Sequence, residues 1–164
     1  MINDDEKKSF EKNYKLALRY LTRAIKTELE VKRYLERRKA NRIHIQKIIE
    51  KLKEYNYIDD DEYTRIYAEN KKKALMSPFA VKYGLRQKGI HGSKSEKIIS
   101  KVFSDFDEKK VARDIALKKA NKMIDIDIKK KLSRISSFLR RKGFPEEAIY
   151  YAMEPIFELA DKDS

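Results

Sequence analysis

Hydrophobic and polar positions follow one another along this chain with the spacing of an α-helix. In the segment VKRYLERR, Val31, Tyr34 and Leu35 fall on one helical face, and charged residues cover the other. The segment RIHIQKIIEKL repeats the pattern between Ile45 and Leu52. Glycine and proline, which mark the turns of sheet proteins, number only four and three. The pattern predicts an all-α protein without a β-sheet.

Several helix starts are marked by side chains that cap exposed backbone amides. Thr27 is followed three residues later by Glu30, and Ser93 by Glu96, which is the spacing of a capping box. Ser77 precedes a proline, a residue that suits the first turn of a helix. We therefore predict helix N-caps at Thr27, Ser77 and Ser93.

A short motif occurs twice where helices are expected to end. It reads LRQKGI at residues 85–90 and LRRKGF at residues 139–144. Gly89 and Gly143 can adopt the left-handed conformation that ends a helix, and the next apolar residue can then fold back onto it. In VKRYLERRKA, Lys39 stands at the corresponding position, so this helix stop is weaker. Capping does not explain the basic residues of the motif.

The motif belongs to a threefold repeat. Leu35, Leu85 and Leu139 superpose at intervals of about fifty residues, a period typical of stacked supersecondary units. Apolar residues match four positions before, thirteen after and seventeen after these leucines: Val31, Val81 and Ile135; Ile48, Ile98 and Ala152; Leu52, Val102 and Ile156. We expect three tandem three-helix repeats at residues 10–57, 58–106 and 107–160. In the third repeat the N-cap of the middle helix is not evident.

Composition narrows the class of protein. The 164 residues include 40 Lys and Arg against 27 Asp and Glu, a formal charge of +13, and 41% are hydrophobic. The charge favours polyanionic partners such as nucleic acid, or an acidic protein groove. No segment has the length of a membrane span or the pattern of a signal peptide, so we expect a cytoplasmic protein without membrane contact.

Catalytic and metal chemistry find no support in the sequence. There is no phosphate-binding glycine motif, no cysteine and no histidine pair that would bind zinc, and His44 and His91 suit packing or surface roles. The acidic run Asp59–Glu62 precedes an expected helix and suits amide capping better than calcium binding. We expect no enzyme activity, no cofactor and no metal.

Ten basic residues on or near the middle helices form the candidate binding stripe. They are Lys32, Arg33, Arg37, Arg38, Lys82, Arg86, Lys88, Arg140, Arg141 and Lys142. Repeated on one edge of a helical stack, they would follow a helical polyanion. The alternative is a solvated face whose charges only favour the helix C-termini.

The order of these segments resembles the RecX family of bacterial recombination regulators over residues 14–157. The resemblance is carried by YLTRAIKTELEVKRYLERR, IIEKLKEYNYIDDDEYTRIYAENK, LRQKGI and FLRRKGF. Its most specific part is the junction of Leu52, Glu54, Tyr57, Ile58, Asp59 and Asp60. Two departures concern loop shape: Asn56 replaces a common glycine, and Lys39 replaces the first helix-end glycine.

The resemblance implies an elongated, curved, solenoid-like monomer that binds RecA recombinase filaments. It also implies inhibition of strand exchange, ATP hydrolysis and coprotease activity in DNA repair and the SOS response, with weak binding to single-stranded DNA and to duplex. From the residues alone, two alternatives stay open. One is a helix-turn-helix-like nucleic-acid-binding protein without a recombinase partner, and the other is a scaffold for another helical protein.

Overall fold

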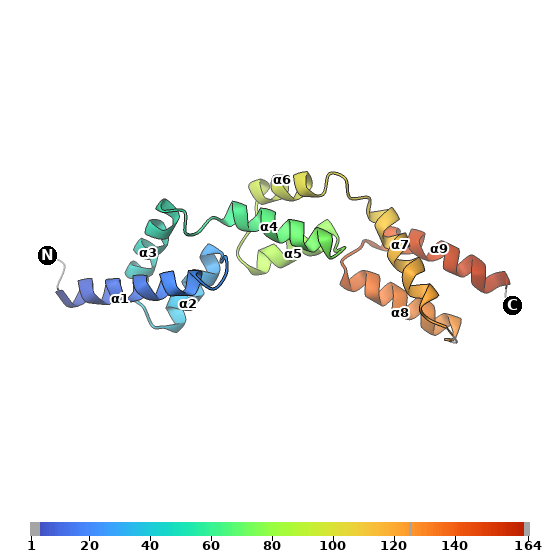
Figure 1. Cartoon of the computed structure of the whole chain (residues 1–164), viewed down its shortest axis with the longest axis horizontal. Coiled ribbons are helices and arrows are strands. Elements are labelled where there is room, and N and C mark those ends of the chain that lie inside the picture. Colours follow the sequence, from blue (N-terminus) through green and yellow to red (C-terminus); the bar gives the residue numbers. More distant parts are fainter. Residues whose placement is uncertain (1–3, 125, 163–164) are drawn as a thin grey trace. The chain divides into compact units, whose positions relative to one another are not determined.

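The computed structural model describes residues 4–124 and 126–162, and within these ranges the chain forms nine α-helices and no strand (Figure 1). The helices are α1 Asp4–Leu21, α2 Glu28–Arg37, α3 Arg42–Glu54, α4 Asp60–Lys73, α5 Pro78–Gln87, α6 Ser93–Val102, α7 Glu108–Asn121, α8 Ile128–Arg141 and α9 Glu146–Lys162. The all-α prediction is confirmed.

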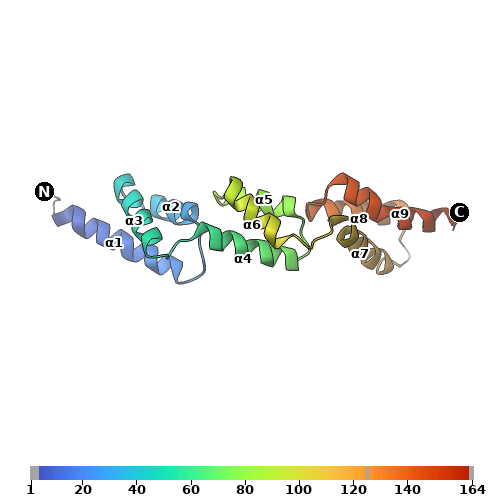
Figure 2. The ribbon, with the colours of Figure 1, turned by 90° about the horizontal axis from the view of Figure 1, so that it is seen from above.

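Two sets of three consecutive helices pack together. Helices α1, α2 and α3 contact one another, and so do α7, α8 and α9, which Figure 2 shows from above. The chain divides into two compact units: residues up to 66 with 84–98, and residues 67–83 with those from 99 onward. The repeat boundaries at residues 10, 58 and 107 stay a prediction, and α1 already begins at Asp4.

The superposed apolar positions form the cores. Leu35, Leu85 and Leu139 are at most 1% exposed, and the residues four positions before them are fully buried. The prediction was wrong by one residue on α6, where Ile99 and Phe103 are buried while Ile98 and Val102 are only partly so. Ile99 and Phe103 are four residues apart, one helical turn, and share a face that Ile98 and Val102 flank.

The predicted helix starts are confirmed in part. Thr27 forms both hydrogen bonds of a capping box with Glu30. Ser93, however, is already helical, because the Glu96 amide donates to the carbonyl of Gly92 at 3.2 Å and places the cap one residue earlier. The cap that the sequence did not reveal on α8 is Asp127, whose carboxylate accepts from the Lys130 amide at 3.1 Å.

None of the described helices is long and apolar enough to cross a membrane.

Candidate partner-binding surface

The middle helices α2, α5 and α8 end in the same hydrogen-bonded turn. Lys39, Gly89 and Gly143 have φ of 58°, 82° and 83°, the left-handed region. In each turn the amide of the following residue donates to a leucine carbonyl four residues before the turn residue. The acceptors are Leu35, Leu85 and Leu139, at 3.1, 3.0 and 3.2 Å. The repeated motif is therefore a helix C-cap, as predicted, and Lys39 forms the same turn at the position where a weaker stop was expected.

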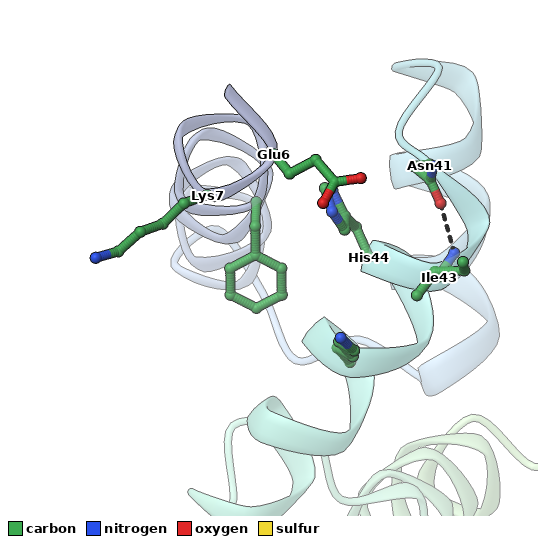
Figure 3. Close-up of a pocket in the computed structure, with 7 residues that line it drawn as sticks. Glu6, Lys7, Asn41, Ile43 and His44 are labelled. Carbon is green, nitrogen blue, oxygen red and sulfur yellow. Dashed lines mark hydrogen bonds between the residues drawn. The ribbon is translucent and has the colours of Figure 1, made fainter. Parts of the chain in front are cut away.

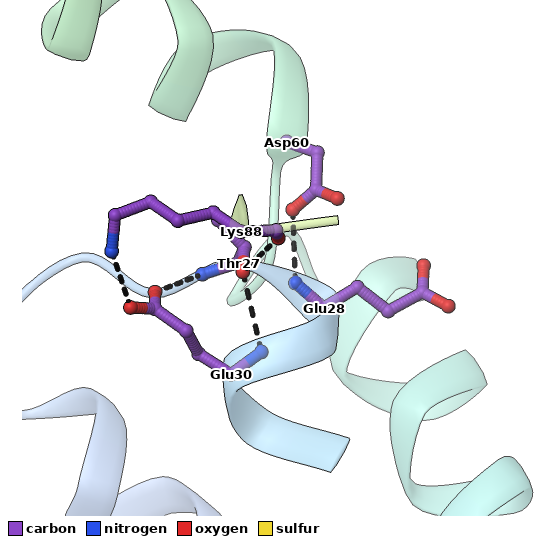
Figure 4. A network of polar contacts seen from close by, with 5 residues as sticks. All are labelled: Thr27, Glu28, Glu30, Asp60 and Lys88. Atoms are coloured by element: carbon purple, nitrogen blue, oxygen red, sulfur yellow. Dashed lines mark hydrogen bonds and ion pairs between the residues drawn. The ribbon is translucent and has the colours of Figure 1, made fainter. Parts of the chain in front are cut away.

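In two of these turns the C-cap also contacts the start of the preceding middle helix. The first joint consists of Thr27, Glu30, Lys88 and Gly89. Figure 4 shows the side chains of Thr27, Glu30 and Lys88. The buried Thr27 hydroxyl accepts from the Glu30 amide at 3.2 Å and donates to the Lys88 carbonyl at 2.9 Å. The Lys88 ammonium lies 2.6 Å from the Glu30 carboxylate.

The charges of the first joint stabilise each other. Burial opposes ionisation of Glu30, but hydrogen bonds from Lys88 and the Thr27 amide outweigh it, so the pKa of Glu30 lies below its usual value. The hydrogen bond to Glu30 raises the pKa of Lys88 despite partial burial. The Lys88 ammonium also lies 5.5 Å from the centre of the Tyr63 ring. Lys88 thus has three contacts within its own unit.

The second joint, Ser77, Ala80, Lys142 and Gly143, repeats the first with different chemistry. The Ser77 amide donates to the Lys142 carbonyl at 2.9 Å, and its hydroxyl donates to the carbonyl of Gly143. The Lys142 ammonium donates to the carbonyl of Ala74, whereas the Lys88 ammonium of the first joint donates to the Glu30 carboxylate. Backbone groups therefore replace the ion pair.

Close packing at the joints explains where glycine is required. A β-carbon on Gly143 would lie 2.6 Å from the β-carbon of Ala80, and one on Gly89 would lie 2.7 Å from that of Leu29. Lys39, which stands at the corresponding position after α2, is exposed. Lys39 bears only the cost of its positive φ, about 1–2 kcal/mol, and no steric conflict.

The Glu30–Lys88 pair predicts a pH-dependent contribution to stability. Because the folded-state pKa of Glu30 is lowered, its contribution is complete above the ordinary value of 4.5 and is lost as pH falls through the lowered pKa. We expect Glu30→Gln to lower the free energy of unfolding by about 1 kcal/mol at pH 7, and the difference from the parent to shrink in acid. Urea unfolding at pH 7 and pH 3.5 measures this, and a difference independent of pH would contradict it.

The structure separates the ten predicted stripe residues by their contacts. Lys88 and Lys142 belong to the joints, and Arg140 forms a two-point ion pair with Glu146 at 2.8 and 3.0 Å. Arg38 lies 5.3 Å from the ring centre of Tyr34. Lys82 is partly buried, and the exposed members are Lys32, Arg33, Arg37, Arg38, Arg86, Arg140 and Arg141.

A basic cluster around Phe138 was only partly visible in the sequence. Arg141 and Lys142, two of the predicted stripe residues, lie 5.9 and 5.6 Å from its ring centre. Lys119 of α7 lies nearer, at 4.0 Å. Only the packing of α7 against α8 brings Lys119 there, and no local sequence signal marks it.

The acidic residues before α4 serve as caps. Asp59 accepts hydrogen bonds from the amides of Asp61 and Glu62 at 2.9 and 3.0 Å, which confirms the capping prediction. Asp60 instead accepts from the Glu28 amide at 2.9 Å, so it caps α2 from another repeat. Burial, opposed by this hydrogen bond, raises the pKa of Asp60.

One pocket, of about 400 Å³, lies between α1 and the start of α3 (Figure 3). Its lining mixes apolar and charged side chains: Glu6, Lys7, Phe10, Asn41, Ile43, His44 and Lys47. His44 packs edge-on against Phe10 with ring centres 5.6 Å apart, in agreement with a packing role. Its buried Nδ1 has no hydrogen-bond partner among the described residues.

The middle helices share one type of C-cap turn, and in two joints the end of one middle helix contacts the start of another. These features define a helical-repeat protein, and its exposed basic side chains suit the binding of an anionic partner. A scan against protein-family models gave no match. The chain is 35% identical over 147 residues to the regulatory protein RecX of Clostridium beijerinckii, covering 87% of this chain and 67% of that protein. It is 31% identical over 158 residues to RecX of Chlorobium phaeobacteroides, covering 96% and 99%. The chain belongs to the RecX family of regulatory proteins.

A solved structure agrees with this assignment at the level of the fold. The crystal structure of RecX from Lactobacillus salivarius matches with a TM-score of 0.70 and 24% identity, covering 91% of this chain and 97% of that one. Several other curated relatives are longer, and the chain spans 53–58% of their length. The predicted family is confirmed.

Proposed function

We propose that this protein binds RecA recombinase filaments on DNA and inhibits them in DNA repair and the SOS response. The observation that carries the proposal is the match to a curated RecX regulatory protein over 96% of this chain and 99% of the relative. The charge of +13 supports it, because a recombinase filament presents DNA phosphate. The protein acts in the cytoplasm as a monomer.

Inhibition is mechanical in this proposal. A chain of helical repeats bound along several recombinase subunits holds their interfaces in one arrangement, so that the filament cannot reset after ATP hydrolysis or admit a second duplex. The joints support this role, because hydrogen bonds from Thr27 and Ser77 fix each middle helix to the next one within its unit. The exposed stripe residues supply attraction to the filament.

We expect the protein to lower ATP hydrolysis by RecA assembled on single-stranded DNA, and to hydrolyse no ATP alone. The first expectation follows from the proposed bridging of subunits, and the second from the absence of a phosphate-binding motif in the sequence. A titration of filament ATPase with increasing protein measures the effect. An unchanged rate at saturating protein would refute the proposal.

Equilibrium binding separates this proposal from a plain nucleic-acid-binding function. A filament regulator binds RecA–DNA filaments more tightly than naked single-stranded DNA or duplex at the same salt concentration. Equal affinity for all three would favour the helix-turn-helix-like alternative.

A further inference from the structure

We propose that one helix, α8, makes the main contact with nucleic-acid phosphates, through an α8 ridge formed by Lys130, Arg134 and Arg141. The inference rests on the proposed function, since it identifies the part of the protein that contacts DNA. It differs from a stripe shared equally among the repeats, and it includes two residues outside the repeated motif.

The charge of the middle helices is unequal. The α8 sequence IKKKLSRISSFLRR contains six basic residues and no acidic one. The corresponding helix of the first repeat, α2, reads ELEVKRYLER, with three basic and three acidic residues. The two helices therefore differ in their attraction for a polyanion, although they occupy equivalent positions in the sequence repeat. Basic residues along α8 attract the polyanion, whereas the glutamates of α2 offset the charge of the basic residues of α2.

The basic residues of the ridge share one side of α8. Lys130, Arg134 and Arg141 are exposed and are spaced by four and seven residues, so they align on one helical face. The buried residues Ile135 and Leu139 lie on the opposite face. At a rise of 1.5 Å per residue the ridge is roughly 16 Å long, which spans two to three nucleotides of an extended strand.

Arg140 is not part of the ridge, although the sequence motif includes it. It projects from another side of α8. Its Nε and Nη2 atoms donate hydrogen bonds to the Glu146 carboxylate at 2.8 and 3.0 Å. A phosphate would have to displace an intramolecular carboxylate to bind there. Arg141 has no such partner among the described residues and points its guanidinium toward Phe138.

The cluster around Phe138 adds charge beside the ridge. Lys119, Arg141 and Lys142 all lie within 5.9 Å of its ring centre. Among the described residues no carboxylate pairs with any of the three. The ring face attracts cations, three like charges around one ring repel one another, and an anion placed among them reduces that repulsion. A phosphodiester strand supplies such anions at regular intervals along the ridge.

The test compares two variants that lose the same charge from equivalent helices. One is Lys130→Gln, Arg134→Gln and Arg141→Gln in α8. The matched control is Lys32→Gln, Arg33→Gln and Arg37→Gln in α2, all of which are exposed. A third variant, K130R/R134K/R141K, keeps the charge of the ridge. Thermal melting establishes that all are folded, and binding of an oligo(dT) strand is titrated at several salt concentrations.

Each lost phosphate contact lowers the log–log salt slope on single strands by about 0.7, so the α8 variant should lose about two units and the α2 control less than half of that. The charge-keeping variant should retain the parent slope. Equal decreases of the salt slope in the α8 and α2 variants, or no decrease in the α8 variant, would overturn the proposal that the α8 ridge contacts phosphate. So would an α8 variant that binds oligo(dT) normally but no longer binds the filament, because the ridge would then contact acidic protein.

Failure of the proposed function appears in a different measurement. If the parent binds oligo(dT) through the ridge but leaves the ATPase of RecA filaments unchanged, the filament proposal fails and the ridge stands. If the parent inhibits the ATPase and the oligo(dT) slopes of the α8 and α2 variants are equal, the ridge fails and the filament proposal stands.

Discussion

Gly143→Ala is expected to lower the free energy of unfolding by about 2–4 kcal/mol, because it combines a left-handed backbone with a steric conflict. At φ of 83° the new β-carbon would lie 2.6 Å from the β-carbon of Ala80, 2.8 Å from the Ser77 hydroxyl and 3.0 Å from the Ala80 amide nitrogen. These atoms belong to a short side chain and to the helix backbone, so they can move away only if α5 shifts. Urea unfolding of the variant and the parent measures the difference.

Two other glycines provide matched controls. Gly92 has φ of 98° with no atom within 4 Å of a β-carbon, so Gly92→Ala should cost only the backbone term of about 1–2 kcal/mol. A β-carbon on Gly89 would lie 2.7 Å from the Leu29 β-carbon and 2.9 Å from its Cδ2 methyl group. The methyl group can change rotamer, and none of the three nearest atoms belongs to the backbone, so Gly89→Ala should fall between the two. The expected order is therefore Gly143, Gly89, Gly92. Equal costs at all three positions would mean that backbone conformation alone determines the effect, and that the second joint is loosely packed.

The glycine motif shows how far the sequence could predict this structure. Its C-cap role depends on a few neighbouring residues, and the left-handed conformation of Gly89 and Gly143 was predicted correctly. The contact of Gly143 with Ser77 joins residues 66 positions apart in the sequence, so no local pattern reveals it. In the first copy Lys39 replaces the glycine and is exposed, and the sequence indicated only a weaker helix stop there.

The candidate surface was harder to predict than the helices. A basic residue in a repeated motif can serve the fold or a partner, and only the identity of its neighbours separates these roles. Lys88 neighbours Glu30 from 58 residues away, and Arg140 neighbours Glu146 across the turn that follows α8. Lys130 and Arg134 lie outside the repeated motif, so recurring positions do not predict them, because the proposed α8 ridge is specific to one repeat.

Thr27→Val is expected to lower the free energy of unfolding by about 2–4 kcal/mol, since it removes two hydrogen bonds at a fully buried site. Valine has nearly the shape of threonine, so packing around the site is retained. The Glu30 amide loses its capping acceptor, and the Lys88 carbonyl loses its donor at 2.9 Å. Both groups are partly shielded from water, so solvent replaces these bonds poorly.

Two variants separate the cap from the joint. Thr27→Ser keeps the hydroxyl and should cost only about 1 kcal/mol, from the lost methyl group. Asn41→Ala removes the exposed cap of α3, which accepts from the Ile43 amide at 2.8 Å and bonds no other helix, so it should cost about 0.5–1 kcal/mol. Chemical denaturation of the three variants gives the comparison. If Thr27→Val cost no more than Asn41→Ala, the hydroxyl would act only as a helix cap. The bond to Lys88 would then contribute nothing to holding α2 against the end of α5.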